Sequence, residues 1–432
     1  MRSVTNKMTY TTCMVYMMLS TNALYFIDRR IYGEWEGKPG DKFTEALNLL
    51  AIVVSLLLFW WGRHKRPPRF NRVLPLAAAG LLVTSVLWSV APSTTITRSV
   101  AYFFLVVGAI GIVQILDTDE VMRLVALIGG VLAAVSLLLL FVVPDIVMAE
   151  TGQTAGFRGL FSQKNALGQA MVIAVLAGLH GMRIGARRRF LYISITLLCT
   201  IVAFLSKSAT SLLTISVFFI LNIIGGLYVK GGIFRIISMF LTIVFSVMFI
   251  LLMKNIDLIY ILLDKDPTLT GRTDLWPYVI DYIYQRPVLG WGFAAFWMPS
   301  NPFFAETCSI VGFCVNEAHN GVLQLLLDVG VVGTAFFLFL WIRNLVMAVK
   351  CINGPAPQLG VSAFLLLVAT LMIGVSEQVL TTVDGPTVQF FLVGFMCEKE
   401  LWLARRARSV VSFRSAELHL GQFETPREED AA

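Results

Sequence analysis

The sequence predicts an all-α polytopic membrane protein with about twelve transmembrane helices and one large extracytoplasmic loop. Of its 432 residues, 57% are hydrophobic and only 14% are charged, whereas a soluble domain carries roughly a quarter charged residues. The apolar residues form long blocks, and basic residues gather in the short loops between them, as in membrane proteins. Because lipid cannot hydrogen-bond the backbone, these blocks are predicted to be helices.

The transmembrane spans are predicted from windows of about 17 to 22 apolar residues. The first span carries no small-residue cleavage site and is therefore interpreted as retained. The spans form a bundle over residues 1–403, and the polar tail 404–432 is expected to be cytoplasmic and disordered. The predicted spans are 9–27, 44–62, 73–91, 100–116, 121–143, 165–182, 190–205, 209–229, 234–253, 321–342, 359–376 and 386–403.

The basic loops predict the orientation of the bundle. Arginine and lysine are dense in 63–72, in 183–189 and after the last span, which makes these segments cytoplasmic by the positive-inside rule. Counting the spans then places both termini in the cytoplasm and residues 254–320 outside it. Because the net charge of +7 is spread over these loops, it does not indicate nucleic-acid binding.

The segment 254–320 is the candidate functional region. It is about 65 residues long and rich in aromatic side chains, far longer than the usual connection between packed helices. Apolar residues at helical spacing in 273–286 predict an amphipathic helix along the membrane surface. Gly290-Trp-Gly292 is expected to form turns, because no strand precedes it as a phosphate-binding loop would require.

Several other patterns offer alternative sites. Cys308 and Cys314 lie close enough for a disulfide in an oxidising compartment, and this is favoured over metal binding by two thiols without a nearby histidine pair. Glu34 or Glu36 in the first outer loop could serve as the catalytic carboxylate of a membrane glycosyltransferase. Two acidic motifs resemble the metal site of nucleotide-sugar transferases: Asp264-Lys-Asp266 and Asp117-Thr-Asp119. The first motif lies outside the cytoplasm, where nucleotide sugars are not expected. The second motif could simply end a helix.

Polar residues form three clusters on the predicted outer side. Arginine suits bidentate contact with phosphate oxygens, and a histidine can act as a general base or hold an acceptor hydroxyl. Together they suit a reaction with a diphosphate leaving group. The simpler alternatives are span anchoring by snorkelling for the first cluster, a helix-end charge for Arg286 and local capping for His319. The clusters comprise Arg158, Lys164 and Asn165; Arg272 and Arg286; and Glu317, His319 and Asn320.

At these clusters the chain resembles the O-antigen ligase and polysaccharide polymerase superfamily, in particular the exopolysaccharide polymerases of the succinoglycan pathway. The resemblance covers about 65 residues, and it depends on the three motifs occurring in order. The matching residues are Gly271-Arg272 with Trp276, Arg286-Pro287 with Leu289-Gly290-Trp-Gly292, and His319-Asn320 with Leu323-Gln324 and Gly330 to Gly333.

The resemblance implies a glycosyltransferase at the periplasmic face of the bacterial inner membrane. Its substrates would be undecaprenyl-diphosphate-linked oligosaccharides, polymerised with the lipid diphosphate as leaving group and without metal or cofactor. Arg272 would contact the diphosphate, with Arg158, Lys164 and Arg286 as further cations, and His319 would activate or position the acceptor hydroxyl. Glu317, Asn320 and Asn165 would orient these groups. Membrane lipid, a chain-length regulator and a flippase are the implied partners.

Three alternative functions remain open from the sequence. An O-antigen-type ligase would share the motifs and differ only in its acceptor. A glycosyltransferase using polyprenyl-monophosphate sugars would depend on Glu34 or Glu36. A flippase of lipid-linked sugars would place charged residues near the bilayer midplane, and the predicted spans carry almost none between their ends.

Overall fold

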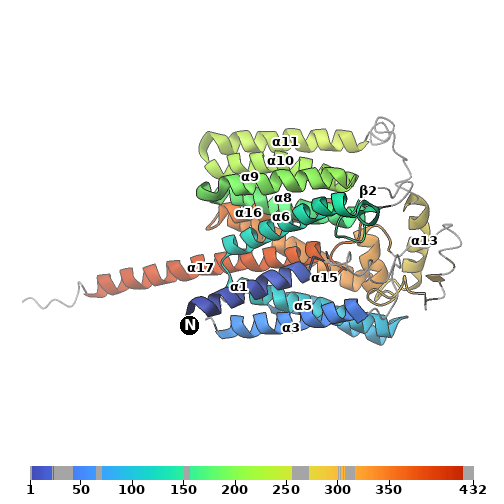
Figure 1. Cartoon of the computed structure of the whole chain (residues 1–432). Helices are drawn as coiled ribbons and strands as arrows, with labels where there is room; N and C mark the ends of the chain where they lie inside the picture. Colours follow the sequence, from blue (N-terminus) through green and yellow to red (C-terminus); the bar gives the residue numbers. More distant parts are fainter. Residues whose placement is uncertain are drawn as a thin grey trace, which may run out of the picture.

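The computed structural model describes residues 2–21, 23, 42–64, 71–149, 156–254, 272–299, 301, 303–304, 306 and 317–421. Long helices lie side by side in a bundle, with α9, α10 and α11 on one side and α1, α3 and α5 on the other (Figure 1). The helices before the large loop are α1 (Arg2–Leu19), α3 (Lys42–His64), α4 (Val73–Thr84), α5 (Pro92–Ile115), α6 (Thr118–Val142), α7 (Pro144–Val147), α8 (Lys164–Ile184), α9 (Arg189–Leu205), α10 (Ala209–Lys230) and α11 (Gly232–Lys254).

The remaining elements come from the large loop and the C-terminal part, together with short pieces between the first helices. Two short 3₁₀ helices, η1 and η3, and a two-stranded antiparallel pair, β1 with β2, connect the early helices. The elements are α13 (Arg272–Gln285), α15 (Gly321–Ile352), α16 (Pro357–Gly374), α17 (Gly385–Gly421), η1 (Ser85–Leu87), η3 (Ala186–Arg188), β1 (Met148–Ala149) and β2 (Gly156–Phe157).

The predicted all-α polytopic class is confirmed. Within the described residues, seven helices are long and apolar enough to cross a membrane: α3, α5, α6, α8, α10, α15 and α16. Three shorter apolar segments, Val73–Leu87, Arg189–Leu205 and Gly232–Met248, coincide with further predicted spans. Each predicted span overlaps a helix, whereas the full number of crossings stays a prediction.

Helix α17 differs from the expectation for the end of the chain. Residues 404–421, expected as part of a disordered tail, continue the helix to Gly421. The physical reason is composition, because no glycine or proline interrupts the chain between Gly394 and Gly421, and the arginine, alanine and leucine residues there favour helix.

A large apolar core joins the helices of the bundle. Helix α3 packs on α5, α6 packs on α8 and α9, and α15 packs on α16. The outward faces are also apolar, with Leu56, Leu197 and Ile236 among the exposed side chains. Apolar side chains on both faces of a helix are expected where lipid replaces water as the solvent.

Helix α13 covers one end of the bundle. It lies at the end opposite the N-terminus and the far part of α17 (Figure 1). Its apolar stripe, Leu275, Val279, Tyr282 and Ile283, is buried against Trp291 and other aromatic residues of the large loop. The predicted amphipathic helix in 273–286 is therefore confirmed, and its apolar face is used for packing within the protein.

Helix α15 is broken at Gly330, where the backbone has a φ of 62°. The segment after α13 supplies the hydrogen bonds that this break removes: Trp291 N donates to Leu327 O at 2.8 Å, and Val331 N donates to Pro287 O at 2.8 Å. A Cβ atom at Gly330 would lie 2.3 Å from Val288 O. Gly290 and Gly292 have φ values of 68° and 101°, so their predicted role as turn residues is confirmed.

Candidate functional site

The His319 imidazole lies between two buried carboxylates. Its Nδ1 atom is 3.1 Å from Glu317 Oε1 and 3.8 Å from Glu377 Oε2. Glu317 precedes α15, whereas Glu377 lies in the connection between α16 and α17. Both glutamate side chains are 7% exposed, against 22% for His319. These three residues are named here the histidine cluster.

The backbone at the head of α15 positions the imidazole. His319 has a φ of 48°, a left-handed conformation that a residue with a Cβ seldom adopts and that is typical of functional sites. Asn320 then caps the helix, because its Oδ1 atom accepts hydrogen bonds from Val322 N and Leu323 N at 3.0 and 3.1 Å. The cap satisfies two free N–H groups of the first turn and fixes the point where the chain enters α15.

The predicted first cluster meets the histidine cluster through Asn165. Its Nδ2 atom donates a hydrogen bond of 2.6 Å to Glu377 Oε1. Asn165 is the second residue of α8, directly after Lys164. The start of α8, the head of α15 and the connection after α16 therefore converge at one place, as the sequence-predicted grouping of Asn165, Glu317, His319 and Asn320 requires.

Gln324 holds the chain before His319 in place from inside α15. Its Oε1 atom accepts hydrogen bonds from Ala318 N at 2.9 Å and from Trp297 Nε1 at 3.0 Å. Its Nε2 atom donates to Asp328 Oδ1 at 3.0 Å. One buried amide therefore joins the large loop, the head of α15 and a carboxylate one helical turn further along.

The surroundings of His319 favour its protonated form. Burial by itself lowers the pKa of the imidazole, but the nearby Glu317 and Glu377 carboxylates raise it further, to about 9. At neutral pH the ring is therefore an imidazolium paired with carboxylates. The general-base role expected for His319 needs a neutral ring, so the carboxylates of the cluster are better placed to accept a proton.

The histidine cluster also has the residue types of a divalent metal site. One ligand atom from each of Glu317, His319 and Glu377 lies within 4.8 Å of the others. Two carboxylates and an imidazole are common ligands for zinc or iron. The distances from His319 Nδ1 to the two carboxylates also suit an imidazolium between them, so the residues fit an ion pair as well as they fit a metal.

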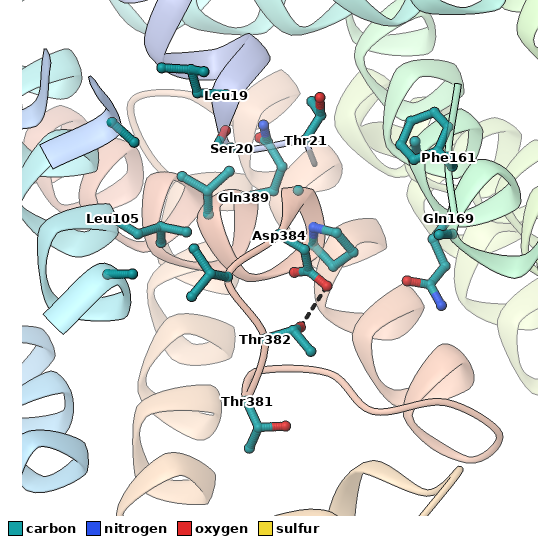
Figure 2. A pocket seen from close by; sticks show the side chains of 18 of the residues that line it. Leu19, Ser20, Thr21, Leu105, Phe161, Gln169, Thr381, Thr382, Asp384 and Gln389 are labelled. Carbon is teal, nitrogen blue, oxygen red and sulfur yellow. Dashed lines mark hydrogen bonds between the residues drawn. The ribbon is translucent and has the colours of Figure 1, made fainter. Parts of the chain in front are cut away.

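A cavity of about 540 Å³ adjoins the cluster, with Glu317 and Glu377 in its wall. Figure 2 shows polar side chains from several elements around it, among them Ser20, Gln169 and Gln389. Asp384 also lies there, accepting hydrogen bonds from Thr382 Oγ1 at 2.5 Å and from Thr387 N at 3.0 Å. Hydroxyl, amide and carboxylate groups of this kind bind sugar hydroxyls through hydrogen bonds.

The predicted cations lie in different surroundings. Arg158 is buried, and its Nε atom donates to Ile146 O at 3.1 Å. The Arg286 guanidinium stacks on the Trp291 ring at 4.3 Å from the ring centre, and its Nη1 atom donates to Trp88 O at 3.2 Å. Neither side chain lines the cavity. Lys164 is the first residue of α8 and Arg272 the first of α13; the side chain of Arg272 lies outside the described part.

Sequence reasoning missed several residues of this region. Glu377, one residue past the predicted span 359–376, belongs to none of the three predicted clusters. Asp328 lies inside α15, although the spans were expected to carry almost no charge between their ends. Arg98 was placed in a loop, whereas α5 begins at Pro92 and includes it. The available signal was the spacing of Gln324 and Asp328, four positions apart on one face of an otherwise apolar helix.

Some predicted alternatives lie outside the described residues: Glu34, Glu36, Asp264, Asp266, Cys308 and Cys314. The second acidic motif is described, and Asp117 is the N-cap of α6 in a capping box with Glu120. The position of the motif at the end of a helix accounts for these acidic residues without a metal.

Part of the chain that forms this site is similar to a known family. Residues 193–338 match the family model described as O-Antigen ligase, a range that includes Arg272, Arg286 and His319 but neither Arg158 nor Glu377. The chain is 27% identical to the exopolysaccharide production protein ExoQ of Rhizobium meliloti (strain 1021), over 69% of this chain and 77% of that protein. Both comparisons confirm the resemblance of the chain to the O-antigen ligase and polysaccharide polymerase superfamily.

Proposed function

We propose that this protein polymerises undecaprenyl-diphosphate-linked oligosaccharide repeat units into exopolysaccharide at the periplasmic face of the inner membrane. The observation that carries the proposal is the histidine cluster at the wall of a polar cavity, within a multi-pass membrane protein of this family. Similarity to an exopolysaccharide production protein favours polymerisation.

The histidine cluster supplies the acid–base chemistry of this reaction. The Glu317 carboxylate accepts the proton of the acceptor hydroxyl while the hydroxyl oxygen bonds to the anomeric carbon of the growing glycan. The bond from that carbon to the lipid diphosphate breaks, and the diphosphate leaves with its electron pair. The His319 imidazolium pairs with Glu317 and orients it, and Asn165 holds Glu377 on the other side.

Arg272 is the proposed contact to the diphosphate from the large loop. It begins α13, and on the same helix Trp276 Nε1 donates a hydrogen bond of 3.1 Å to Ala318 O. The start of α13 is thereby tied to the residue next to His319. Arg158, Lys164 and Arg286 are further cations of the same region, with Arg158 and Arg286 holding the surrounding backbone and rings.

The alternative is a ligase that moves the glycan to a different acceptor. Donor, leaving group and histidine cluster would be the same, so the two activities differ only in what the cavity admits. The proposed partners are membrane lipid and, within the same pathway, a flippase and a chain-length regulator.

The proposed function is tested by reconstitution. Purified protein in lipid nanodiscs is incubated with lipid-linked repeat units, with and without EDTA, and the products are sized. We expect polymer with the native protein, and a loss of about a hundredfold or more in rate with Glu317→Gln or His319→Gln, the range for loss of acid–base catalysis.

The matched control is His64→Gln, because His64 is an exposed histidine at the last residue of α3. It should polymerise at the native rate. Absence of any product longer than one repeat with the native protein would contradict the polymerase, and transfer of one glycan to a different acceptor would establish the ligase. Activity that is abolished by EDTA and restored by a metal ion would replace the ion-pair interpretation of the cluster.

A further inference from the structure

Arg98 places a cation in the wall of the cavity. It lies in the second turn of α5, and its side chain is exposed. The space it faces is the cavity that Glu317, Gln324 and Asp328 also line. Among the described residues Arg98 makes no hydrogen bond and no ion pair within 4 Å, and Asp328 is the acidic group that acts on it electrostatically.

The carboxylates of the same cavity are, by contrast, each served by donors within the protein. Asp328 accepts from an amide, Asp384 from a hydroxyl and a backbone N–H, and Glu377 from an amide, while Glu317 pairs with an imidazolium. The donors are Gln324, Thr382, Thr387, Asn165 and His319. The guanidinium of Arg98, with five N–H donors, makes no hydrogen bond to these carboxylates.

A guanidinium held in a cavity without bonded partners suits an anionic ligand. Because the Arg98 side chain is exposed and lines the cavity, its N–H groups can contact a ligand there. Arginine binds the oxygens of phosphate groups through paired N–H donors. Resting on the proposed function, we propose that Arg98 binds the diphosphate of the lipid-linked substrate inside this cavity.

The position of Arg98 connects the diphosphate to the histidine cluster. Arg98 lies close enough to Asp328 for their charges to interact, Asp328 accepts from Gln324, and Gln324 accepts from Ala318 N, the residue before His319. A diphosphate at Arg98 would therefore lie within a network that ends beside the acid–base groups. The leaving group and the acceptor hydroxyl would meet in one cavity.

The cavity also has the two kinds of surface that a lipid-linked sugar presents. Apolar side chains of α3 and α6, such as Leu47, Ile52 and Ile128, line the wall. Polar side chains such as Gln169 and Gln389 line it as well (Figure 2). A lining of both kinds suits an amphiphile with a prenyl chain, an anionic centre and a glycan.

Binding of geranylgeranyl diphosphate to the purified full-length protein in nanodiscs tests the proposal without turnover. Arg98→Gln should weaken binding by about tenfold to a hundredfold, the range for loss of a charge-assisted contact. Arg98→Lys should retain part of the affinity, since it keeps the charge without the planar fork. Geranylgeraniol, which lacks the diphosphate, should bind native protein and Arg98→Gln equally.

The matched control is Arg235→Gln, because Arg235 lies on α11 with its guanidinium over the Tyr228 ring, away from the cavity. It should bind the diphosphate like native protein. Unchanged affinity in Arg98→Gln, or an equal loss for the diphosphate and the alcohol, would overturn the proposal. Lost polymerisation with unchanged diphosphate binding would likewise overturn it, because Arg98 would then contact an acidic group on the glycan. Failure of the proposed function alone would leave the binding result unaffected.

Discussion

The ionisation of His319 determines how the candidate site can work. A histidine free in solution is mostly neutral at pH 7, but here two carboxylates hold the proton on the ring. The predicted role of His319 stays a prediction, and the raised pKa favours the positioning role over proton abstraction. The single positive charge of the imidazolium offsets one of the two carboxylate charges, and in the proposed reaction the Glu317 carboxylate is the proton acceptor.

The raised pKa predicts how stability depends on pH. His319 titrates near pH 9 in the folded protein, against 6.5 as its ordinary value. Because the folded state holds the proton more tightly, the stabilisation is complete below pH 6.5 and is lost as the pH rises through 9. We expect His319→Gln to lower Tm at about pH 6 by several degrees, and to have little effect above pH 9.

Thermal unfolding of the purified protein at a series of pH values would measure this difference. His64→Gln, far from the carboxylate pair, serves as the control and should follow the native curve throughout. A His319→Gln deficit that grows with pH, rather than shrinking, would show that the ring is neutral in the folded protein.

At the scale of elements, the break in α15 organises the site. The segment 287–292 bonds to the backbone on both sides of Gly330, and Gln324 and Asp328 lie on the part of the helix before the break. If α15 continued as a regular helix through Gly330, the Gln324 and Asp328 side chains would point in a different direction relative to the rest of the helix. The break therefore positions the polar groups of the cavity, in the way that interrupted helices do in membrane transporters.

Gly330→Ala tests the importance of this break. The φ of 62° and ψ of −168° belong to a region that only glycine adopts readily, so alanine should cost about 1–3 kcal/mol from backbone strain alone. The contact with Val288 O at 2.3 Å adds to that cost. We expect a lower Tm and a strongly reduced polymerisation rate.

Gly226→Ala is the matched substitution within a helix. Gly226 lies in α10, and a Cβ there would meet no atom within 4 Å. Its Tm should stay unchanged or rise slightly, because alanine favours helix over glycine. Equal stability of the two variants would show that α15 tolerates a regular turn at Gly330.

At the scale of the whole molecule, composition and charge distribution were sufficient to predict the fold class. Apolar blocks give helices because lipid leaves the backbone no other partner, and every predicted span overlaps a helix. The helical extension of α17 was missed because polar composition was taken to mean disorder. Within the site, His319, Glu317, Asn320 and Asn165 were predicted. Glu377 and Arg98 were not, because only the packing of distant helices brings them to the same cavity.

The arrangement of the bundle predicts which side each part of the chain occupies. Helix α13 lies at one end, and the N-terminus and the far part of α17 lie at the other (Figure 1). We expect a phosphatase reporter inserted after Leu263 to be active outside the cytoplasm, and the same reporter after Gly421 to be inactive. The reverse result would place the histidine cluster on the cytoplasmic side, where the proposed donor could not reach it.

The hydrogen bonds between residues 287–292 and the interrupted helix bear on how the protein is made. The ribosome synthesises the segment around Pro287 before α15, so the backbone groups of this segment cannot bond to α15 until that helix has been made. The backbone of α15 on either side of Gly330 cannot complete its hydrogen bonds before it contacts that segment. Assembly of the candidate site is therefore expected to follow synthesis of α15.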